Sequence, residues 1–327
     1  MSDQKFSFEP PSTAEVPRFA GIPTFMRLPH VSVDDPRMRE VDVGLIGVPW
    51  DGGTTNRAGA RHGPRQMRDM STLMRNVHPT FLINPYELAN AADLGDTPVN
   101  PLSIDTTLQQ IEDFYTRALD HDIVPLSAGG DHLVSLPILR ALTKKTGSVG
   151  MVHFDAHTDT FDRYFGGYKY THGTPFRRAI EEGILDPKRT IQIGIRGGIY
   201  TRSDYQWGLD QGIRVVFIEE YNELGVQGVI EEIQRVVGPD LPTYVSFDVD
   251  FLDPVYAPGT GTPEIGGVSS GDAQVLLRSL RNLNLVGGDV VEVAPPFDPS
   301  GNTALVAATM MWEILCMLCE QTGARRS

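Results

Sequence analysis

Short apolar runs alternate along the chain with longer segments in which apolar residues recur at helical spacing. The short runs are rich in Val and Ile and are mostly apolar at consecutive positions, which is typical of strands buried on both faces. We predict strands at residues 41–49, 122–130, 148–155, 190–197, 213–220, 242–250 and 285–293. We predict helices at residues 104–121, 133–145, 173–183, 227–237, 271–282 and 303–320.

Strands that alternate with helices predict a parallel sheet with helices on both faces. The fold class that we expect is therefore α/β, a three-layer α/β/α sandwich with a mainly parallel sheet. A chain of 327 residues, of which 40% are hydrophobic, is long enough to bury a large core. Because no internal repeat or low-complexity linker divides it, we predict a single domain over residues 1–327. Residues 1–16 are polar and proline-bearing, which predicts a flexible N-terminal arm.

The composition indicates which partners and which cellular compartment to expect. Lys and Arg total 28 against 42 Asp and Glu, a formal charge of −14, so we expect no nucleic-acid partner. The longest apolar stretch, residues 304–312, stops at Glu313 and is shorter than a membrane span, so we expect no membrane association. Cys316 and Cys319 lie one turn apart in a predicted helix, which favours buried free thiols and a cytoplasmic protein.

Polar side chains follow four of the predicted strands at their carboxyl ends. "HFDAHTD" places Asp155, His157 and Asp159 at alternate positions, which point to one side of an extended chain. Other strand ends supply His132 in "GGDH", Asp248 and Asp250 in "SFDVD", and Glu292 in "DVVEV". Each residue alone fits a turn or a helix cap. Parallel strands bring their carboxyl ends to one edge of the sheet, however. Four carboxylates gathered there would repel one another unless cations lay between them: Asp155, Asp159, Asp248 and Asp250.

The residue types favour a pair of metal ions. Four carboxylates carry a charge that two divalent cations cancel, and six ligands serve two ions if carboxylates bridge them. Oxygen-rich ligands with a little imidazole suit Mn²⁺, with Ni²⁺ or Co²⁺ as alternatives. We therefore predict two Mn²⁺ per chain. Because coordination lowers the pKa of water, we predict a metal-bridging hydroxide as the nucleophile.

Four motifs together resemble the signatures of the ureohydrolases, the arginase and agmatinase family of binuclear manganese amidinohydrolases: "GGDH", "FDAHTDT", "SFDVDFLDPVYAPGTGTPEIGG" and "DVVEVAPPFD". The resemblance covers the chain from about Pro17 onward and implies an arginase-like fold and a homo-oligomer, either a trimer or a hexamer. It implies that one cation is bound by His132, Asp155, Asp159 and Asp248, and the other by Asp155, His157, Asp248 and Asp250. It also implies that His172, in "YTHGTPF", shuttles a proton and that Glu292 holds the substrate guanidinium.

Substrate choice must come from loops, because all guanidines share the reacting group. We expect substrate contacts from loops 47–68 and 160–173, with Trp50, Asn56, Arg57 and Tyr170 as the named candidates beside Glu292. Basic residues outnumber acidic ones in both loops, which favours a substrate with a carboxylate tail. Arg61 and Arg65 fit structural ion pairs equally well. The segments "PRFAGIPTFMRLPH" and "VPWDGGTTNRAGARHGPR" are more similar to bacterial guanidinopropionases and guanidinobutyrases than to agmatinases.

The function that we predict is hydrolysis of a small guanidino acid, best 3-guanidinopropionate, to urea and an amino acid. The alternatives within the family are an agmatinase, a guanidinobutyrase or a hydrolase of methylated guanidines or biguanides. A single-zinc deacetylase would need fewer metal ligands than the six present, which argues against that enzyme. A phosphoesterase would be favoured by a phosphate-binding glycine loop, and "GGD" is too short to form one. A catalytically silent, metal-binding partner subunit is the alternative from another class, and such a chain typically lacks a ligand or the shuttle residue, all of which are present here.

Overall fold

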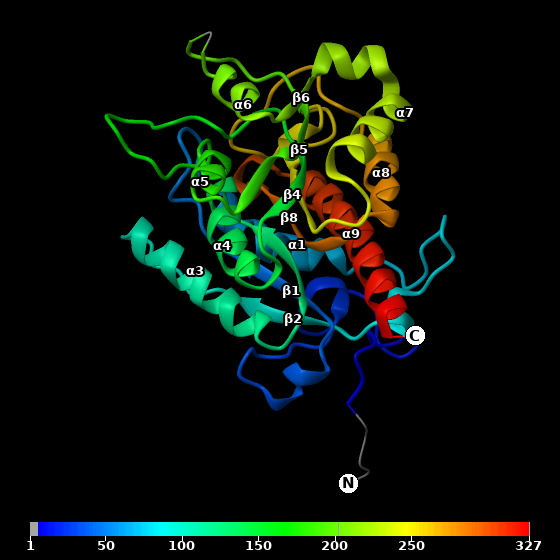
Figure 1. Cartoon of the computed structure of the whole chain (residues 1–327). Coiled ribbons are helices and arrows are strands. Elements are labelled where there is room, and N and C mark those ends of the chain that lie inside the picture. The colour runs from blue at the N-terminus through cyan, green and yellow to red at the C-terminus, as the bar shows by residue number, and fades with distance from the viewer. Residues whose placement is uncertain (1–5, 202, 327) are drawn as a thin grey trace.

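The core of the protein is a sheet of eight strands, all parallel. The computed structural model describes residues 6–201 and 203–326 (Figure 1). Its strands lie in the order β2-β1-β3-β8-β7-β4-β5-β6. The strands are β1 (Val43–Val48), β2 (Ala91–Asp96), β3 (Val124–Gly129), β4 (Val149–Phe154), β5 (Leu185–Ile195), β6 (Arg214–Phe217), β7 (Thr243–Asp248) and β8 (Leu285–Val291).

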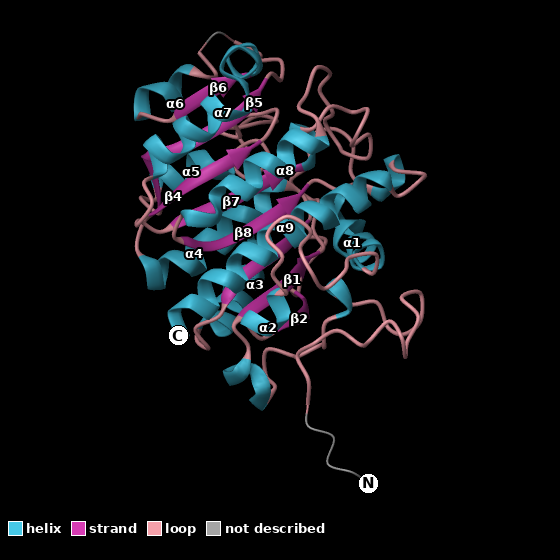
Figure 2. Ribbon diagram, turned by 90° about the vertical axis from the view of Figure 1, so that its right-hand side faces the viewer, coloured by secondary structure: helices cyan, strands magenta, loops and turns pink. Residues whose placement is uncertain are grey.

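Helices cover both faces of the sheet (Figure 2). One face carries α3 (Ile104–Leu119), α4 (Ser135–Thr146) and α5 (Pro175–Glu181), and the other carries α1 (Gly63–Ser71), α7 (Ile218–Val237), α8 (Ser270–Ser279) and α9 (Asn302–Arg326). The short helices α2 (Pro85–Leu88) and α6 (Gln206–Gln211) pack beside α9 and β5. The predicted three-layer sandwich is confirmed.

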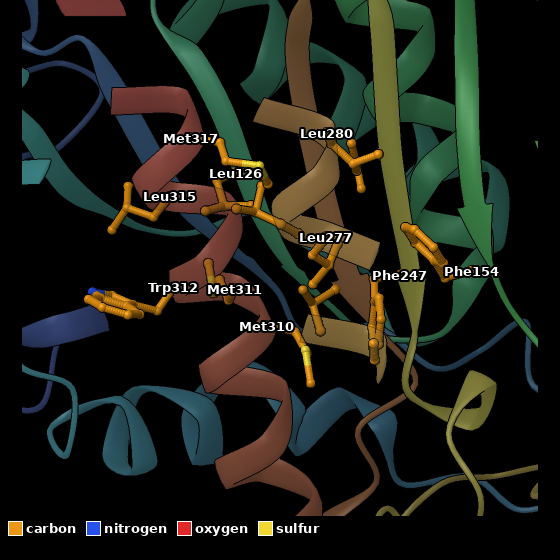
Figure 3. Close-up of a cluster of buried hydrophobic side chains, with 14 of the residues drawn as sticks. Leu126, Phe154, Phe247, Leu277, Leu280, Met310, Met311, Trp312, Leu315 and Met317 are labelled. Atoms are coloured by element: carbon orange, nitrogen blue, oxygen red, sulfur yellow. The ribbon is translucent and has the colours of Figure 1, made fainter. Parts of the chain in front are cut away.

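Alternation along the strands divides the core into two layers. In β4, Val149 and Met151 pack into the layer under α3 and α4, whereas Val152 and Phe154 pack into the layer under α8 and α9. Figure 3 shows part of the second layer, where side chains of α8 and α9 lie near Phe154 and Phe247 of the sheet. Each fully buried side chain of this size stabilises the fold by about 1.5–3 kcal/mol relative to an exposed one.

Helix α9 corrects one expectation. The apolar stretch before Glu313 was expected to be too short to cross a membrane, but α9 is 25 residues long in all and passes the test of length and composition for a membrane span. Its most apolar window is 78% buried inside the fold, so α9 is a core helix. Glu313 stays inside because Arg278 donates to both its oxygens and His78 Nε2 lies 2.8 Å from Oε2. Cys316 and Cys319 are free and buried on this helix, as predicted.

The sequence patterns did not predict strand β2, whereas every other strand overlaps a predicted range; β5 begins at Leu185, five residues before its predicted start. It lies at the edge of the sheet beside β1, and its sequence "AADLGD" is poor in branched residues. Its buried Asp93 lies 2.8 Å from Nε of Arg68, an ion pair that no apolar pattern could reveal.

Part of the predicted N-terminal arm contacts the body of the protein. Residues 1–5 lie outside the described residues. Phe8 belongs to the core layer under α3, and Phe6 packs edge-on against it at 5.1 Å between ring centroids. Further on, Arg27 Nη2 donates to the carbonyl oxygen of Val16 at 3.0 Å.

Candidate metal centre and active site

The predicted ligands gather at the carboxyl ends of four strands that are consecutive in the sheet, β3, β8, β7 and β4. Asp155 directly follows β4, Asp248 ends β7, and Glu292 directly follows β8. His132 comes three residues after the end of β3. The strand order therefore brings segments together that are far apart in the sequence, at the edge where open parallel sheets bind ligands.

Two glycines allow the chain to approach closely here. A Cβ on Gly130 would lie 2.4 Å from the carbonyl oxygen of Trp50, so only glycine lets β3 turn toward His132 at this point. A Cβ on Gly197, after β5, would lie 2.4 Å from Cδ2 of His157, so glycine also leaves room for that ring.

One group of ligand atoms surrounds the imidazole of His132. Its Nδ1 lies 3.1 Å from Oδ2 of Asp155, 3.0 Å from Oδ2 of Asp159 and 3.2 Å from Oδ2 of Asp248. This nitrogen is buried and has no hydrogen-bond partner among the described residues. Asp248 also caps the following turn, because its Oδ1 accepts the N–H of Asp250 at 2.8 Å, but its second oxygen remains directed at His132.

A second group surrounds His157. Its Nδ1 lies 3.1 Å from Oδ2 of Asp250 and 3.5 Å from Oδ1 of Asp155, so Asp155 presents one oxygen to each histidine. His153 also lies close, with Nε2 2.7 Å from Oδ2 of Asp155. However, Gln192 donates to Nδ1 of His153, so this ring uses both nitrogens in hydrogen bonds and supports Asp155 from behind.

The carboxylate charges among the six predicted metal ligands would repel one another without bound cations. Burial, and then the charges of Asp250 and Asp155, raise the pKa of Asp248 well above its usual value, and burial with Asp155 raises the pKa of Asp250 to about 6. Burial lowers the pKa of His132, but the three carboxylates around it raise it well above its usual value. Like charges in a dry site are costly unless cations offset them.

The spacing of the ligand atoms also fits metal ions. Neighbouring corners of an octahedron with bonds of about 2.1 Å are about 3 Å apart. The atoms around His132 Nδ1 have this spacing, at 3.0 to 3.2 Å, and an unshared nitrogen lone pair lies among them. The residues present can therefore hold a divalent cation beside His132, with mainly oxygen ligands. Asp250 and Asp155, with oxygens 3.1 and 3.5 Å from Nδ1 of His157, offer a second position beside that ring.

Glu292 and His172 form a pair beside this cluster. Oε1 of Glu292 accepts the N–H of His132 at 3.0 Å and lies 2.8 Å from Nδ1 of His172. Its Oε2 is buried with no hydrogen-bond partner among the described residues. Glu292 has φ +65° and Asp159 has φ +51°, left-handed conformations that cost a non-glycine residue about 1–2 kcal/mol and that concentrate at functional sites.

Comparison with known proteins agrees with this geometry. A family model described as the arginase family matches residues 41–317. The chain belongs to the arginase family. It is 62% identical to a guanidinopropionase of Pseudomonas aeruginosa, over 96% of this chain and 97% of the relative. It is 46% identical to a guanidinobutyrase of the same species, over 93% and 94%. The solved structure of proclavaminate amidinohydrolase from Streptomyces clavuligerus superposes with a TM-score of 0.88 at 40% identity, over 93% of this chain and 99% of that chain.

A cavity of about 400 Å³ opens beside the ligands of this arginase-family protein. His157, Asp159, Asp248, His172 and Glu292 line it, and so do two of the predicted substrate contacts, Asn56 and Arg57.

The other two predicted substrate contacts lie elsewhere. Trp50 is 3% exposed and packs in the core, and Tyr170 lies beside Arg140, so neither is among the described residues that line the cavity. Arg61 pairs with Asp51 at 2.5 Å, which agrees with the structural alternative for that residue.

Several residues of the cavity wall were missed. Phe161, Tyr164 and Tyr200 form an aromatic cluster with ring centroids 5.6 to 6.2 Å apart. Glu264 lies in the motif "GTGTPEIGG", and its Oε1 is 3.5 Å from Nε2 of His157. Glu264 could have been predicted, because it lies between glycines in a motif that carries the family resemblance. Nothing in the sequence singled out Tyr200.

The metal-free protein is expected to lose stability as the pH rises from 6.5 to 9. Burial and Glu292 raise the pKa of Asp131 to about 8, and the pKa of His172 is about 9 because Glu292 outweighs the lowering effect of burial. The folded chain therefore holds protons in this range that the unfolded chain has released. Each such proton lowers the free energy of unfolding by up to about 1.4 kcal/mol per pH unit.

Melting temperatures in the presence of a chelator measure this effect. Asp131→Asn should flatten the decline, whereas added Mn²⁺ should raise the melting temperature more at pH 9 than at pH 6.5, because its ligands bind in their deprotonated forms. A melting temperature that rises with pH in the metal-free protein would contradict the expectation.

Proposed function

We propose that this chain hydrolyses a small guanidino acid, with 3-guanidinopropionate as the first choice, to urea and an amino acid. The observation that carries the proposal is the buried, unpartnered Oε2 of Glu292, in a cavity shared with His157, Asp159 and Asp248. An ionised carboxylate oxygen with no other partner can accept a charge-assisted hydrogen bond from a guanidinium. The names of the guanidinopropionase and guanidinobutyrase relatives support the same substrate class.

Manganese is the metal that we propose for both positions, with nickel or cobalt as alternatives. The ligands that we propose for one ion are His132, Asp155, Asp159 and Asp248, which form the group around His132. For the other ion we propose the group around His157, with Asp155 and Asp250, and add Asp248 as the shared ligand that the family resemblance implies. Two bound divalent cations would supply a water of lowered pKa as the nucleophile.

Glu292 orients the substrate. Its Oε1 is occupied by the N–H of His132 and by the ring of His172, which fixes the plane of the carboxylate. Oε2 is then directed at the cavity and accepts from the guanidinium. The carbon under attack is thereby held beside Asp159 and Asp248, in the orientation that the reaction requires.

His172 protonates the leaving amine. The tetrahedral centre formed on the guanidinium carbon breaks down only when the departing nitrogen carries a proton. We assign that proton to Nε2 of His172, which lies 2.7 Å from the hydroxyl of Thr55 on the cavity wall. Nε2 accepts the backbone N–H of Thr55 at 3.1 Å in this structure, so that hydrogen bond must break when Nε2 carries the proton. Nδ1 meanwhile remains bonded to Glu292, so the ring keeps its orientation when the proton moves.

Arg57 supplies the positive charge that selects a carboxylate tail. Its Nε donates to the carbonyl oxygen of Gly261 at 3.0 Å and its Nη2 to that of Thr260 at 2.6 Å, while the guanidinium lies 4.3 Å from the ring centroid of Phe297. These contacts hold a cation rigidly at the cavity wall, with Asn56 beside it. An ammonium tail, as in agmatine, would meet repulsion there.

We also propose that the enzyme works in the cytoplasm as a homo-oligomer, a trimer or a hexamer. The two free, buried cysteines support a reducing compartment. Phe19 and Ile22, which are 93% and 90% exposed, support burial of that surface in an assembly.

A urea-release screen tests the function. With Mn²⁺ bound, kcat/KM for 3-guanidinopropionate is expected to exceed that for guanidinobutyrate about tenfold or more, since one extra methylene costs this much in a fitted site. Agmatine, arginine and guanidine should be slower still, and nickel should activate less than manganese. Equal or faster turnover of agmatine would overturn the choice of an acid, and an inactive purified chain would favour the silent-subunit alternative.

Arg57→Met tests, in the same screen, whether the charge of Arg57 selects an acidic substrate. The variant keeps an unbranched side chain over Phe297 but loses the charge, so the ratio of acid to agmatine turnover should fall about tenfold or more. Arg65→Met is the matched control, because Arg65 is exposed and is not among the described residues that line the cavity. An unchanged ratio in Arg57→Met would remove its proposed role.

A further inference from the structure

A chain of buried polar groups lies behind His132, on the side away from the cluster of carboxylates. Nε2 of His132 lies 2.8 Å from Oγ of Ser246, and this hydroxyl donates to Oδ1 of Asp289 at 2.7 Å. Ser246 on β7 and Asp289 on β8 face each other in the register of the sheet. All three residues are fully buried. Neither Ser246 nor Asp289 has a part in the function proposed above.

Asp289 is held by hydroxyl groups alone among its described hydrogen-bond partners. Its Oδ2 accepts from the hydroxyls of Ser135 at 2.7 Å and Tyr244 at 2.8 Å, and its Oδ1 accepts from Ser246. An ionised carboxylate accepts hydrogen bonds and donates none.

The role of Asp289 as acceptor from three hydroxyls fixes the direction of the hydrogen bonds that lead to His132. Because the hydroxyl of Ser246 gives its proton to Asp289, its oxygen must accept from Nε2 of His132. The ring therefore carries its proton on Nε2. The lone pair then lies on Nδ1, the atom that is 3.0 to 3.2 Å from three carboxylate oxygens and has no partner among the described residues.

We propose that Asp289 is a positioning residue that acts through Ser246 to keep His132 in the tautomer that binds a divalent cation through Nδ1. The proposal rests on the metal centre proposed above and adds two residues to it. Outer hydrogen bonds of this kind orient a metal-binding histidine and typically contribute 10- to 100-fold in affinity for the ion.

Asp289→Asn is expected to reverse the direction of these hydrogen bonds, and asparagine has nearly the same volume as aspartate. The amide oxygen is expected at the place of Oδ2, where it keeps the hydrogen bonds from Ser135 and Tyr244. The amide nitrogen then takes the place of Oδ1 and donates to Ser246. Ser246 in turn donates to Nε2 of His132, which leaves the proton on Nδ1, where the cation should bind.

The measurement is manganese binding, followed through the electron paramagnetic resonance signal of free Mn²⁺ during titration. The parent protein should bind two ions, and Asp289→Asn should bind one of them about 10- to 100-fold more weakly. Anomalous diffraction from crystals grown with Mn²⁺ should place the lost ion beside His132 and the retained ion beside His157. Ser246→Ala breaks the same chain at its centre and should give the same pattern.

Tyr244→Phe is the matched control. It removes one donor from the opposite oxygen of Asp289 but leaves the path from His132 to Ser246 intact, so both ions should bind within about twofold of the parent. Parental binding of both ions by Asp289→Asn and Ser246→Ala would overturn the proposal. Equal weakening by Tyr244→Phe would also overturn it, because the effect would then be general to the buried network. A parent protein that binds no Mn²⁺ would instead overturn the proposed metal centre.

Discussion

Asp155→Asn is expected to abolish turnover and to release bound cations from both halves of the site. Oδ2 of Asp155 lies 3.1 Å from Nδ1 of His132, and Oδ1 lies 3.5 Å from Nδ1 of His157, so one side chain serves both groups. Asparagine removes the negative charge and turns an amide N–H toward one of the groups. We expect kcat/KM to fall by about 10³-fold or more, and elemental analysis to find less than one metal ion per chain.

Asp162→Asn is the matched control, because it makes the same chemical change in the same loop. Asp162 is 40% exposed and pairs with Arg163 at the surface, 2.9 Å away. It also lies 3.2 Å from Nη2 of the buried Arg178, which keeps a second partner in Glu181 when Asp162 is replaced. We expect this variant to keep both ions and parental activity, since exposed ion pairs contribute little. An Asp155→Asn protein that retains two ions and measurable turnover would contradict the idea that this carboxylate is shared.

The convergence of the candidate metal ligands could be predicted because they lie at strand ends, where side-chain direction repeats every two residues. Asp155, His157 and Asp159 follow an apolar run at alternate positions, and the rule that parallel strands end at one edge brings their neighbours close. The strand order itself could not be predicted. It depends on how the crossover helices pack, and only the structure shows that β3, β8, β7 and β4 are adjacent.

The substrate contacts were harder to predict because loops have no period. Trp50 and Tyr170 were chosen for their loops, yet Trp50 lies in the core and Tyr170 packs at its edge. The wall residue Glu264 is positioned by long-range contacts instead. Arg196, after β5, donates to its carbonyl oxygen at 2.8 Å and to that of Asp250 at 2.7 Å. Contacts of this kind, between loops that are far apart in the sequence, cannot be predicted from the local sequence.

The roles of the buried polar residues are a second feature that could not be predicted from the sequence. The serine in "YVSFD" and the aspartate in "GGDVV" interrupt strands that are otherwise apolar, and composition alone gives them no role. Their meaning depends on register, because Ser246 and Asp289 face each other across β7 and β8. Asp93 is a similar case, since its partner Arg68 comes from another element. Buried charges of this kind are explained only by their partners.

His172→Asn is expected to lower kcat by about 10²- to 10⁴-fold while both ions remain bound. The ring contacts Glu292 and Thr55, and none of its described hydrogen bonds is to a proposed metal ligand. Asparagine has no group that can hold and release the proton needed by the leaving amine. Steady-state urea release and elemental analysis on the same sample separate the two effects.

His121→Asn provides the control for that experiment, because His121 is exposed at the end of α3 and is not among the described residues that line the cavity. It should match the parent in both measurements. Two results distinguish the roles of His172. Lost metal together with lost turnover would mean that the ring supports the ligand cluster, whereas retained turnover would mean that another group protonates the amine. Only slow turnover with two bound ions agrees with a proton carried by His172, because the hydrolytic centre is then intact and the departing nitrogen lacks its acid.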